Sequence, residues 1–468
     1  LWILVEHNRK APDVSLPTWS MLPFVALLAC IAVLPLIRQT APYWEHNWCK
    51  LVIALGLGVP VGLWMWFGHD PHLVTHALAE YGQFITLLAS LFVVTGGIFV
   101  AGDLKATPRN NTFLLGAGAI LASFAGTTGA AMLLIRPILN TNAERKHKAH
   151  TMVFAILIVA NCGGLLTPLG DPPLYVGLMR GVPFTWTFSL FLPWLFVNGL
   201  LLFTYYALDR RRYAAEPTSA LAQDRAAATP LALKGASNIV WLAVIIASVA
   251  LLGQWPWIKV AVQIAAAAAS YLLTPRTIRF GDNEFTWSPI IEVAALFAGI
   301  FLTMIPALQI LRTEAHTLPL NEYTFFGFTG ALSSVLDNTP TYLAFFDMGQ
   351  ELTVAGQPVV AGVPELYLTA IALGAVTCGA ITYIGNGPNF MVKAIAEERG
   401  VAMPSFGRYV VWAAIYLVPI LVALVCVFIS PLPLVKLAGL ALTLGLLARP
   451  VYWIVESRRA LAPSRPVN

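Results

Sequence analysis

The sequence predicts an all-α polytopic membrane protein, built as an inverted-topology repeat with two re-entrant helical hairpins, two broken transmembrane helices and about eleven spans. Three observations predict this class. Of the 468 residues, 58% are hydrophobic and 11% are charged, whereas soluble domains carry roughly 25% charged residues. Apolar windows long enough to cross about 30 Å of hydrocarbon recur along the chain. A polar motif that interrupts one such window is repeated 215 residues later.

The apolar windows define the order of the elements. Eleven are expected to span the membrane, at residues 19–37, 49–67, 83–102, 150–180, 186–208, 237–253, 255–273, 288–311, 363–399, 406–430 and 433–455. Segments 112–139 and 321–347 have two short apolar arms around a polar tip, which is typical of a re-entrant hairpin. The predicted organisation is N-terminal scaffold spans in 1–82, a first repeat in 83–212, a cytoplasmic linker in 213–234, a second repeat in 235–430, and a C-terminal span and tail in 431–468.

The distribution of Lys and Arg indicates the orientation. With the loop that contains Arg145, Lys146 and Lys148 in the cytoplasm, 22 of the 28 Lys and Arg residues fall on that side, whereas Lys259 is among the six outside. The first hairpin then enters from the cytoplasm and the second from outside, as in an inverted repeat. The same layout places the C-terminus in the cytoplasm.

The repeated motif interrupts two of the predicted spans. Residues 161–173 read Asn-Cys-Gly-Gly-Leu-Leu-Thr-Pro-Leu-Gly-Asp-Pro-Pro. Four positions recur 215 residues later, and the pairs are Thr167 and Thr382, Gly170 and Gly385, Asp171 and Asn386, and Pro173 and Pro388. Glycine and proline do not continue a helix, and a broken backbone within hydrocarbon survives only where protein or a watery cavity satisfies its polar groups. Two matched breaks therefore predict a binding site near the middle of the membrane.

Two aspartates are the main candidates for ion exchange. Asp171 follows the first break, and Asp337 lies at the second hairpin tip. Each could serve only as the N-cap of the helix that follows it. Each could instead bind a cation or a proton, because a carboxylate at membrane depth is costly without such a partner. The two roles are compatible.

Other oxygen-bearing side chains lie at the same tips and breaks. They are Thr127, Thr128, Asn161, Thr167, Asn338, Thr339, Thr382, Asn386 and Asn389. Each could make only a local hydrogen bond, but together they suit a small hard cation. We expect Na⁺ to bind at Asp171, Asp337, Asn338 and Asn386. Glu292 is a possible proton carrier, or alternatively reaches the interface or pairs with an arginine. Half-helix N-termini favour anions, so the motif itself suits ions of either sign.

Four motifs carry a resemblance to a known family. They are residues 161–173, Gly-Val-Pro-Phe-Thr-Trp at 181–186, Leu-Asp-Asn-Thr-Pro-Thr-Tyr at 336–342 and Gly-Asn-Gly-Pro-Asn-Phe at 385–390. Over about residues 83–430 the chain resembles a bacterial family described as NhaD-like sodium:proton antiporters or citrate transporters. The resemblance implies membership of the ion transporter superfamily, in which hairpin tips and broken helices bind the coupling cations and the substrate. It also implies a homodimer formed through a scaffold domain, with a hairpin domain that moves as an elevator.

The hairpin tips depart from part of this superfamily. Its dicarboxylate symporters carry Ser-Asn-Thr at both tips, whereas here the first tip reads Gly-Thr-Thr-Gly and the second Asp-Asn-Thr-Pro. The added carboxylate would repel an anion and attract a cation. We therefore expect a secondary Na⁺(Li⁺)/H⁺ antiporter of the bacterial inner (plasma) membrane. The alternative is a cation-coupled citrate or dicarboxylate symporter.

Other function classes are not expected. The net charge of +5 is small and scattered, so a nucleic-acid partner is excluded. The expected partners are the lipid bilayer and small inorganic cations. An enzyme is not expected because the His residues fall in predicted loops, and no cofactor is expected beyond the transported ions. The chain also lacks a Walker A motif, which argues against primary active transport.

Overall fold

The computed structural model describes residues 16–461 apart from 36, 38, 45, 353, 355 and 357. The chain forms two compact units. The first contains Leu1–Tyr81 and Glu292–Glu314, and the second contains Gly82–Ile291 and Ala315–Asn468. The long helices α5 (Pro71–Thr95) and α14 (Ser288–Glu314) each contribute residues to both units.

The first unit is built from apolar helices that pack through small and aliphatic residues. Its other elements are η1 (Thr18–Met21), α2 (Leu22–Val33), α3 (Ala41–Trp44) and α4 (Asn47–Gly68). Val61 and Met65 of α4 are buried against Val74 of α5 and Leu302 of α14. A Cβ atom on Gly58 would lie 3.1 Å from the Cα of Gly299, so α4 and α14 cross closely where neither has a side chain.

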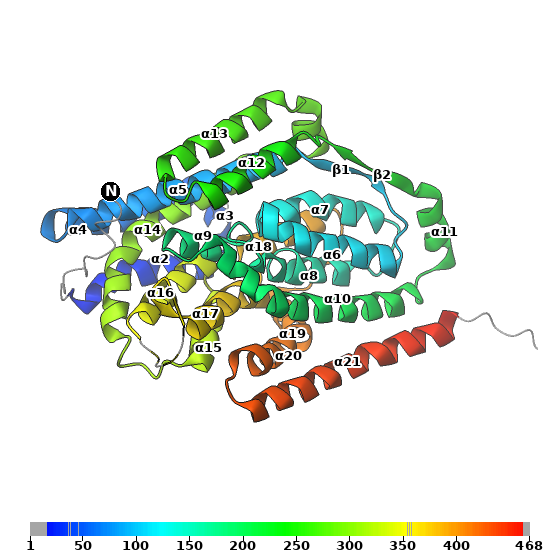
Figure 1. Cartoon of the computed structure of the whole chain (residues 1–468). Helices are drawn as coiled ribbons and strands as arrows, with labels where there is room; N and C mark the ends of the chain where they lie inside the picture. Colours follow the sequence, from blue (N-terminus) through cyan, green and yellow to red (C-terminus); the bar gives the residue numbers. More distant parts are fainter. Residues whose placement is uncertain are drawn as a thin grey trace, which may run out of the picture. The chain divides into compact units, whose positions relative to one another are not determined.

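The second unit contains both helix pairs predicted as hairpins. Its elements up to residue 234 are β1 (Phe99–Asp103), α6 (Pro108–Ala125), α7 (Thr127–Thr141), α8 (Ala149–Ile158), η2 (Cys162–Leu165), α9 (Pro172–Met179), η3 (Phe184–Leu190), α10 (Phe191–Tyr213), α11 (Thr218–Ala227) and β2 (Thr229–Lys234). Helices α6 and α7 lie side by side (Figure 1). Gly126 joins them with φ +80°, a conformation that a residue with a Cβ rarely adopts.

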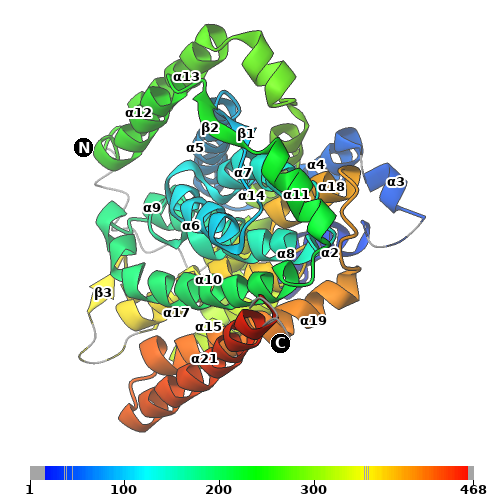
Figure 2. The same ribbon diagram turned by 90° about the vertical axis from the view of Figure 1, so that its right-hand side faces the viewer.

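The remaining elements of the second unit include the second helix pair. They are α12 (Asn238–Leu251), α13 (Pro256–Leu273), the π-helical turn η4 (Thr277–Asp282), α15 (Glu322–Ser333), α16 (Asn338–Gln350), β3 (Val359–Val360), β4 (Val363–Pro364), α17 (Glu365–Cys378), η5 (Gly379–Ile381), α18 (Gly387–Glu398), α19 (Phe406–Tyr416), α20 (Val418–Leu424), the π-helical turn η6 (Val425–Ile429) and α21 (Pro433–Leu461). Helices α10 and α21 run beside each other in both views (Figures 1 and 2).

The structure confirms the all-α polytopic membrane class. Among the described residues, seven helices are long and apolar enough to cross a membrane, and four shorter apolar helices accompany them. These helices fall within or overlap the eleven predicted spans. The hairpins and breaks have the predicted helix boundaries to within a few residues, while their re-entrant and inverted placement in a bilayer stays a prediction.

Two predicted segments differ from the structure. The predicted span 83–102 is wrong at both ends, because α5 begins at Pro71 and ends at Thr95, and residues 99–103 form β1. The predicted linker 213–234 is not a plain connection, because it contains α11 and β2. Strand β2 pairs with β1 in antiparallel register, with Phe99 opposite Lys234 (Figure 2). The backbone N–H and C=O groups of β1 thus form hydrogen bonds with β2, whereas in a continued helix they would bond within the helix.

The linker is also attached to the loops around it by carboxylates. Asp224 of α11 accepts a hydrogen bond from the backbone N–H of Ala106 at 2.8 Å. Glu216 accepts from the backbone N–H groups of Lys146 at 3.0 Å and His147 at 2.8 Å. The segment between the two predicted repeats therefore folds onto the ends of α6, α7 and α8.

Asp103 is predicted to make stability depend on pH. Burial raises its pKa from the ordinary 3.8 to about 6, and the carboxylates of Glu144 and Asp224 add to the rise. Because the folded state holds this proton more tightly than the unfolded state, stability falls as pH rises through this window. Asp103→Asn should raise the apparent Tm at pH 8 by about 1–3 °C, and by less at pH 4.5.

The control for this prediction is Asp70→Asn. The Asp70 side chain accepts a bond from the backbone N–H of His72 at 2.9 Å, which asparagine can also accept. Thermal unfolding of the purified protein at the two pH values gives the comparison. An Asp103→Asn effect that is equal at both pH values, or larger at the acidic one, contradicts the prediction.

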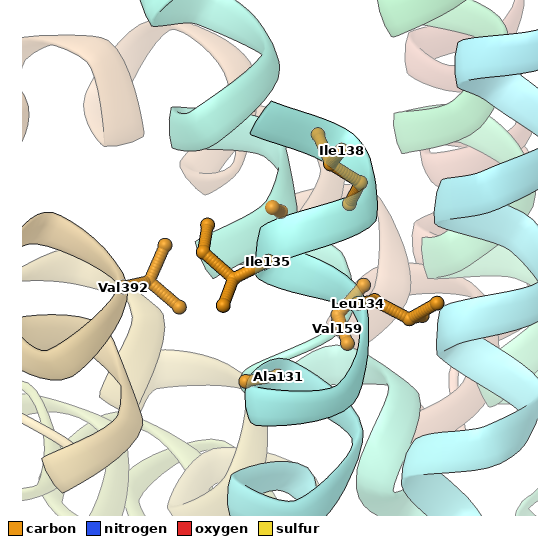
Figure 3. Close-up of a pocket in the computed structure, with 7 residues that line it drawn as sticks. Ala131, Leu134, Ile135, Ile138, Val159 and Val392 are labelled. Carbon is orange, nitrogen blue, oxygen red and sulfur yellow. The ribbon is translucent and has the colours of Figure 1, made fainter. Parts of the chain in front are cut away.

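A small apolar cavity lies between α7, α8 and α18 (Figure 3). Its volume is about 10 Å³, and Ile135 and Val392 face each other across it. A space of this size is at the lower limit for one water molecule and offers it no polar partner. The candidate site lies instead at the two helix breaks.

Candidate functional site

The first break is stabilised by hydrogen bonds to the backbone and by a close approach between two glycines. Helix α8 ends at Ile158 and α9 begins at Pro172. The hydroxyl of Thr167 donates to the backbone carbonyl of Ser123, near the end of α6. The backbone N–H of Thr127 donates to the carbonyl of Gly170 at 2.9 Å. A Cβ on Gly170 would collide with the backbone carbonyl of Gly164, so this close approach requires glycine.

The second break repeats this arrangement. The hydroxyl of Thr382 donates to the backbone carbonyl of Ser334 at 2.5 Å, as Thr167 does to Ser123. A Cβ on Gly385 would lie 2.6 Å from the carbonyl oxygen of Gly379. The break residues in the matching contacts are offset by the same 215 positions as the motif, and their acceptors Ser123 and Ser334 by 211. Each hairpin tip is fastened to the break in its own half of the chain.

Asp171 connects the two halves. Its side chain is buried, with 1% of its surface exposed. One carboxylate oxygen accepts a hydrogen bond from the Thr127 hydroxyl at 3.0 Å, and the other accepts from the Asn338 amide at 2.9 Å. Thr127 begins α7 and Asn338 begins α16, so one carboxylate contacts both hairpin tips. Asp171 occupies the N-cap position of α9, but its side chain makes no capping hydrogen bond.

Three asparagines form a second cluster between the breaks. The Asn161 amide donates to the side-chain oxygen of Asn389 at 2.6 Å. Asn386 donates to the side-chain oxygen of Asn161 at 3.2 Å and to the carbonyl of Ala160 at 3.1 Å. Asn389 donates to the carbonyls of Gly379 and Thr382. All three side chains are buried, and their amides satisfy backbone carbonyls that the breaks leave free.

The other residues predicted at the tips make fewer hydrogen bonds. Asp337 is partly exposed and accepts a hydrogen bond from the backbone N–H of Thr339 at 3.0 Å, so it caps α16. No hydrogen bond joins it to Asp171 among the described residues. The Thr339 hydroxyl is buried without a partner in the described part of the chain. Thr128 is partly buried beside Thr127.

Glu292 belongs to the first unit. It forms an ion pair with Lys50 at 2.7 Å, and 42% of its side-chain surface is exposed. The structure thus shows an ion pair at Glu292, but its partner is a lysine and not the arginine that the sequence analysis named. A role of Glu292 in proton transfer stays a prediction.

One residue near the site escaped the sequence analysis. Lys259, predicted to lie outside the membrane, is buried in α13 with 4% of its surface exposed. Its ammonium lies 5.4 Å from the ring centre of Tyr175, which is in α9 one turn after Asp171. A lysine within the window 255–273 was the available signal, but the sequence does not reveal which side of the helix is covered.

The donor set suits a weakly held cation more than a resident metal. Across residues 16–461, with the gaps given above, no group of three or more His, Cys, Asp and Glu side chains is arranged to hold a metal ion. The hydrogen-bond partners of the Asp171 side chain are the hydroxyl of Thr127 and the amide of Asn338. Carboxylate, hydroxyl and amide oxygens are hard ligands that suit Na⁺ or Li⁺ as a transported ion.

The fold and this site define a class: a polytopic helical membrane protein with a buried polar site where two broken helices meet two helical hairpins. Residues 13–429 match the sequence model of a family described as "Putative citrate transport". The chain belongs to this family and is a membrane transporter of the citrate-transporter type. The match extends further toward the N-terminus than the predicted resemblance, which began near residue 83. A comparison with curated proteins finds no match.

Proposed function

We propose that the protein is a Na⁺(Li⁺)/H⁺ antiporter that exchanges the two ions at Asp171. The observation that carries this proposal is a buried carboxylate whose partners are neutral groups from both hairpin tips. No Lys, Arg or His side chain pairs with Asp171 among the described residues. An unpaired carboxylate charge is costly in a medium of low dielectric, so Asp171 should hold either a proton or a metal cation.

Exchange follows from this competition. A cation that arrives at ionised Asp171 is coordinated by the carboxylate, the Thr127 hydroxyl and the side-chain oxygen of Asn386, or by that of Asn338 once its amide, which donates to Asp171 in the structure, turns over. Protonation of Asp171 removes the charge and releases the cation. Each occupied state is electrically compensated, whereas the empty ionised state is not. The site therefore favours reorientation with one of the two ions bound, which couples their movement in opposite directions.

Several finer features belong to the same proposal. Asp337 contributes a second carboxylate at the tip of the second pair, and elevator-type movement of the hairpins gives alternating access. The protein works as a homodimer in the bacterial inner membrane, with its C-terminus in the cytoplasm. The fastening of each tip to its break by Thr167 and Thr382 supports the hairpins and breaks moving as one body.

The second candidate is a cation-coupled citrate or dicarboxylate symporter. The description of the family, which names citrate, favours it. In that case Asp171 and its neighbours would hold the coupling cation, and the substrate carboxylates would need further donors. The asparagine cluster already uses its amide donors on backbone and side-chain oxygens, which favours antiport.

Transport assays on proteoliposomes test the two candidates. The purified protein is reconstituted with an acidic interior, and internal pH is followed after external addition of Na⁺, Li⁺, K⁺ or citrate. Antiport predicts alkalinisation of the interior by Na⁺ or Li⁺ without citrate. Na⁺-dependent uptake of labelled citrate, with no pH response to Na⁺ alone, would reject antiport and establish the symporter.

A further inference from the structure

Lys259 is a buried cation with no anionic partner among the residues that the structure describes. It lies near the start of α13, and 4% of its surface is exposed. Within the described chain, its ammonium has neither an ion pair nor a hydrogen bond, and it lies over the ring of Tyr175, 5.4 Å from the ring centre. The face of an aromatic ring attracts a cation, but it accepts none of the three N–H bonds that an ammonium can donate.

Tyr175 carries a second unpaired donor. Its side chain is 1% exposed, and its hydroxyl has no hydrogen-bond partner in the described residues. The residue lies in α9, which begins immediately after Asp171. The opposite side of α9 is closely packed, because a Cβ on Gly177 would collide with the hydroxyl of Tyr342 on α16. Helix α9, which begins directly after Asp171, is therefore held in place and positions the Tyr175 ring.

The Lys259 ammonium and the Tyr175 hydroxyl can both donate a hydrogen bond, and neither has an acceptor in the described chain. An ammonium only donates hydrogen bonds, and a buried phenol hydroxyl without a partner is available to donate one. Buried polar groups in proteins are nearly always satisfied, so the buried Tyr175 hydroxyl without a partner, on a ring that the Lys259 ammonium contacts, indicates an acceptor that the described chain does not supply. A positive charge among these donors selects an anionic acceptor over a neutral one.

We propose that Lys259 and Tyr175 form a binding site for one small anionic group, either a halide or a single carboxylate. Lys259 supplies the charge, and the Tyr175 hydroxyl supplies a directed hydrogen bond. Tyr175 lies one helical turn after Asp171, so the site is on the helix that begins at the candidate exchange site. This inference concerns binding, and it stands whether the transporter works by antiport or by symport.

Thermal unfolding in the presence of defined anions tests the proposal. The purified full chain is titrated with chloride or citrate against a bulky sulfonate buffer anion, at constant Na⁺ concentration, pH and ionic strength. A ligand that binds the folded state raises the Tm in a saturable way. The expected result is such a rise with at least one of the two anions. Saturation by chloride alone assigns a halide site, and saturation by citrate alone assigns a carboxylate site.

Three variants show whether Lys259 and Tyr175 are responsible. Lys259→Met keeps the length of the side chain and should weaken anion binding by at least about tenfold, because the only charge is lost. Tyr175→Phe removes one oxygen atom and should weaken it several-fold. Lys436→Met, at an exposed lysine of α21, should leave it unchanged.

The outcomes that overturn the proposal are distinct. A saturable shift of equal midpoint in the intact protein and in both site variants would place the anion elsewhere. The absence of any saturable shift in the intact protein, with both anions, would reject the site even if a variant failed to fold. Since transport is not measured, neither result depends on the antiport proposal.

Discussion

Asp171→Asn is expected to abolish cation-dependent proton movement, with a loss of about 100-fold or more in the initial rate, because this carboxylate carries the exchanged ions. Asparagine is close to aspartate in shape; its single oxygen can accept from the Asn338 amide, and its NH2 group can donate to the Thr127 hydroxyl, which can also act as an acceptor. The variant should therefore fold and lose transport. The measurement is the internal pH of proteoliposomes after addition of Na⁺, together with size-exclusion chromatography and Tm for folding.

Two further aspartate variants test whether the loss of transport is specific to Asp171. Asp282→Asn, in a partly exposed pair with Lys234 at 2.9 Å, should transport at the wild-type rate. Asp337→Asn keeps the cap of α16, because Asn and Asp are equally good N-cap residues. Loss of transport in this variant would thus give Asp337 an ion-carrying role, and retained transport would restrict that role to Asp171. Wild-type exchange by a folded Asp171→Asn protein would contradict the mechanism.

The breaks in the helices were predictable because their cause is local. Glycine and proline end a helix wherever they occur in a run such as residues 161–173, and the copy at 376–388 obeys the same rule. The turns between the paired helices α6–α7 and α15–α16 also fall at the small and polar residues that the sequence analysis named as tips, whereas re-entrance stays a prediction. The structure adds the contacts of Thr167 and Thr382 that fasten tip to break.

The difference between Asp171 and Asp337 could not be read from the sequence. Both precede a half-length helix, and both are suitable N-caps. Asp337 caps its helix, whereas Asp171 is engaged by the tips of both pairs. Which role prevails depends on whether donors from other elements reach the carboxylate, and those donors lie 44 and 167 residues away in the chain.

Long-range pairing also explains the missed strand and the missed lysine. Residues Phe99–Asp103 continue the apolar run of α5, and nothing nearby reveals that Thr229–Lys234 will pair with them. Lys259 lies at the N-terminal end of the apolar window 255–273, where a lysine side chain is ordinarily expected to be exposed. Its burial follows from the packing of α13 near Tyr175 of α9, which a hydropathy window does not contain.

The largest effect on stability is expected at Arg145. Its guanidinium lies 2.6 Å from the Asp209 carboxylate and 3.6 Å from that of Glu216, and all three side chains are fully buried. Arg145→Met would leave two buried carboxylates without this cation. Removal of one partner from a buried ion pair costs about 3–5 kcal/mol, more than most single substitutions. We therefore expect a large fall in Tm and in the yield of monodisperse protein.

A double variant distinguishes lost charge compensation from lost packing. If Arg145 acts by neutralising Asp209, then Arg145→Met combined with Asp209→Asn should recover part of the stability, because the uncompensated carboxylate is removed with its partner. His150, whose Nε2 lies 2.8 Å from Asp209, can then bond to the amide oxygen of the new asparagine. Lys148→Met serves as the control, since the one hydrogen bond of the Lys148 side chain in the described part of the chain is a solvent-exposed bond to the carbonyl of Ala143. Strictly additive losses in the double variant would instead show that Arg145 stabilises this end of α10 by packing, and the linker would then be held chiefly by the backbone bonds to Glu216.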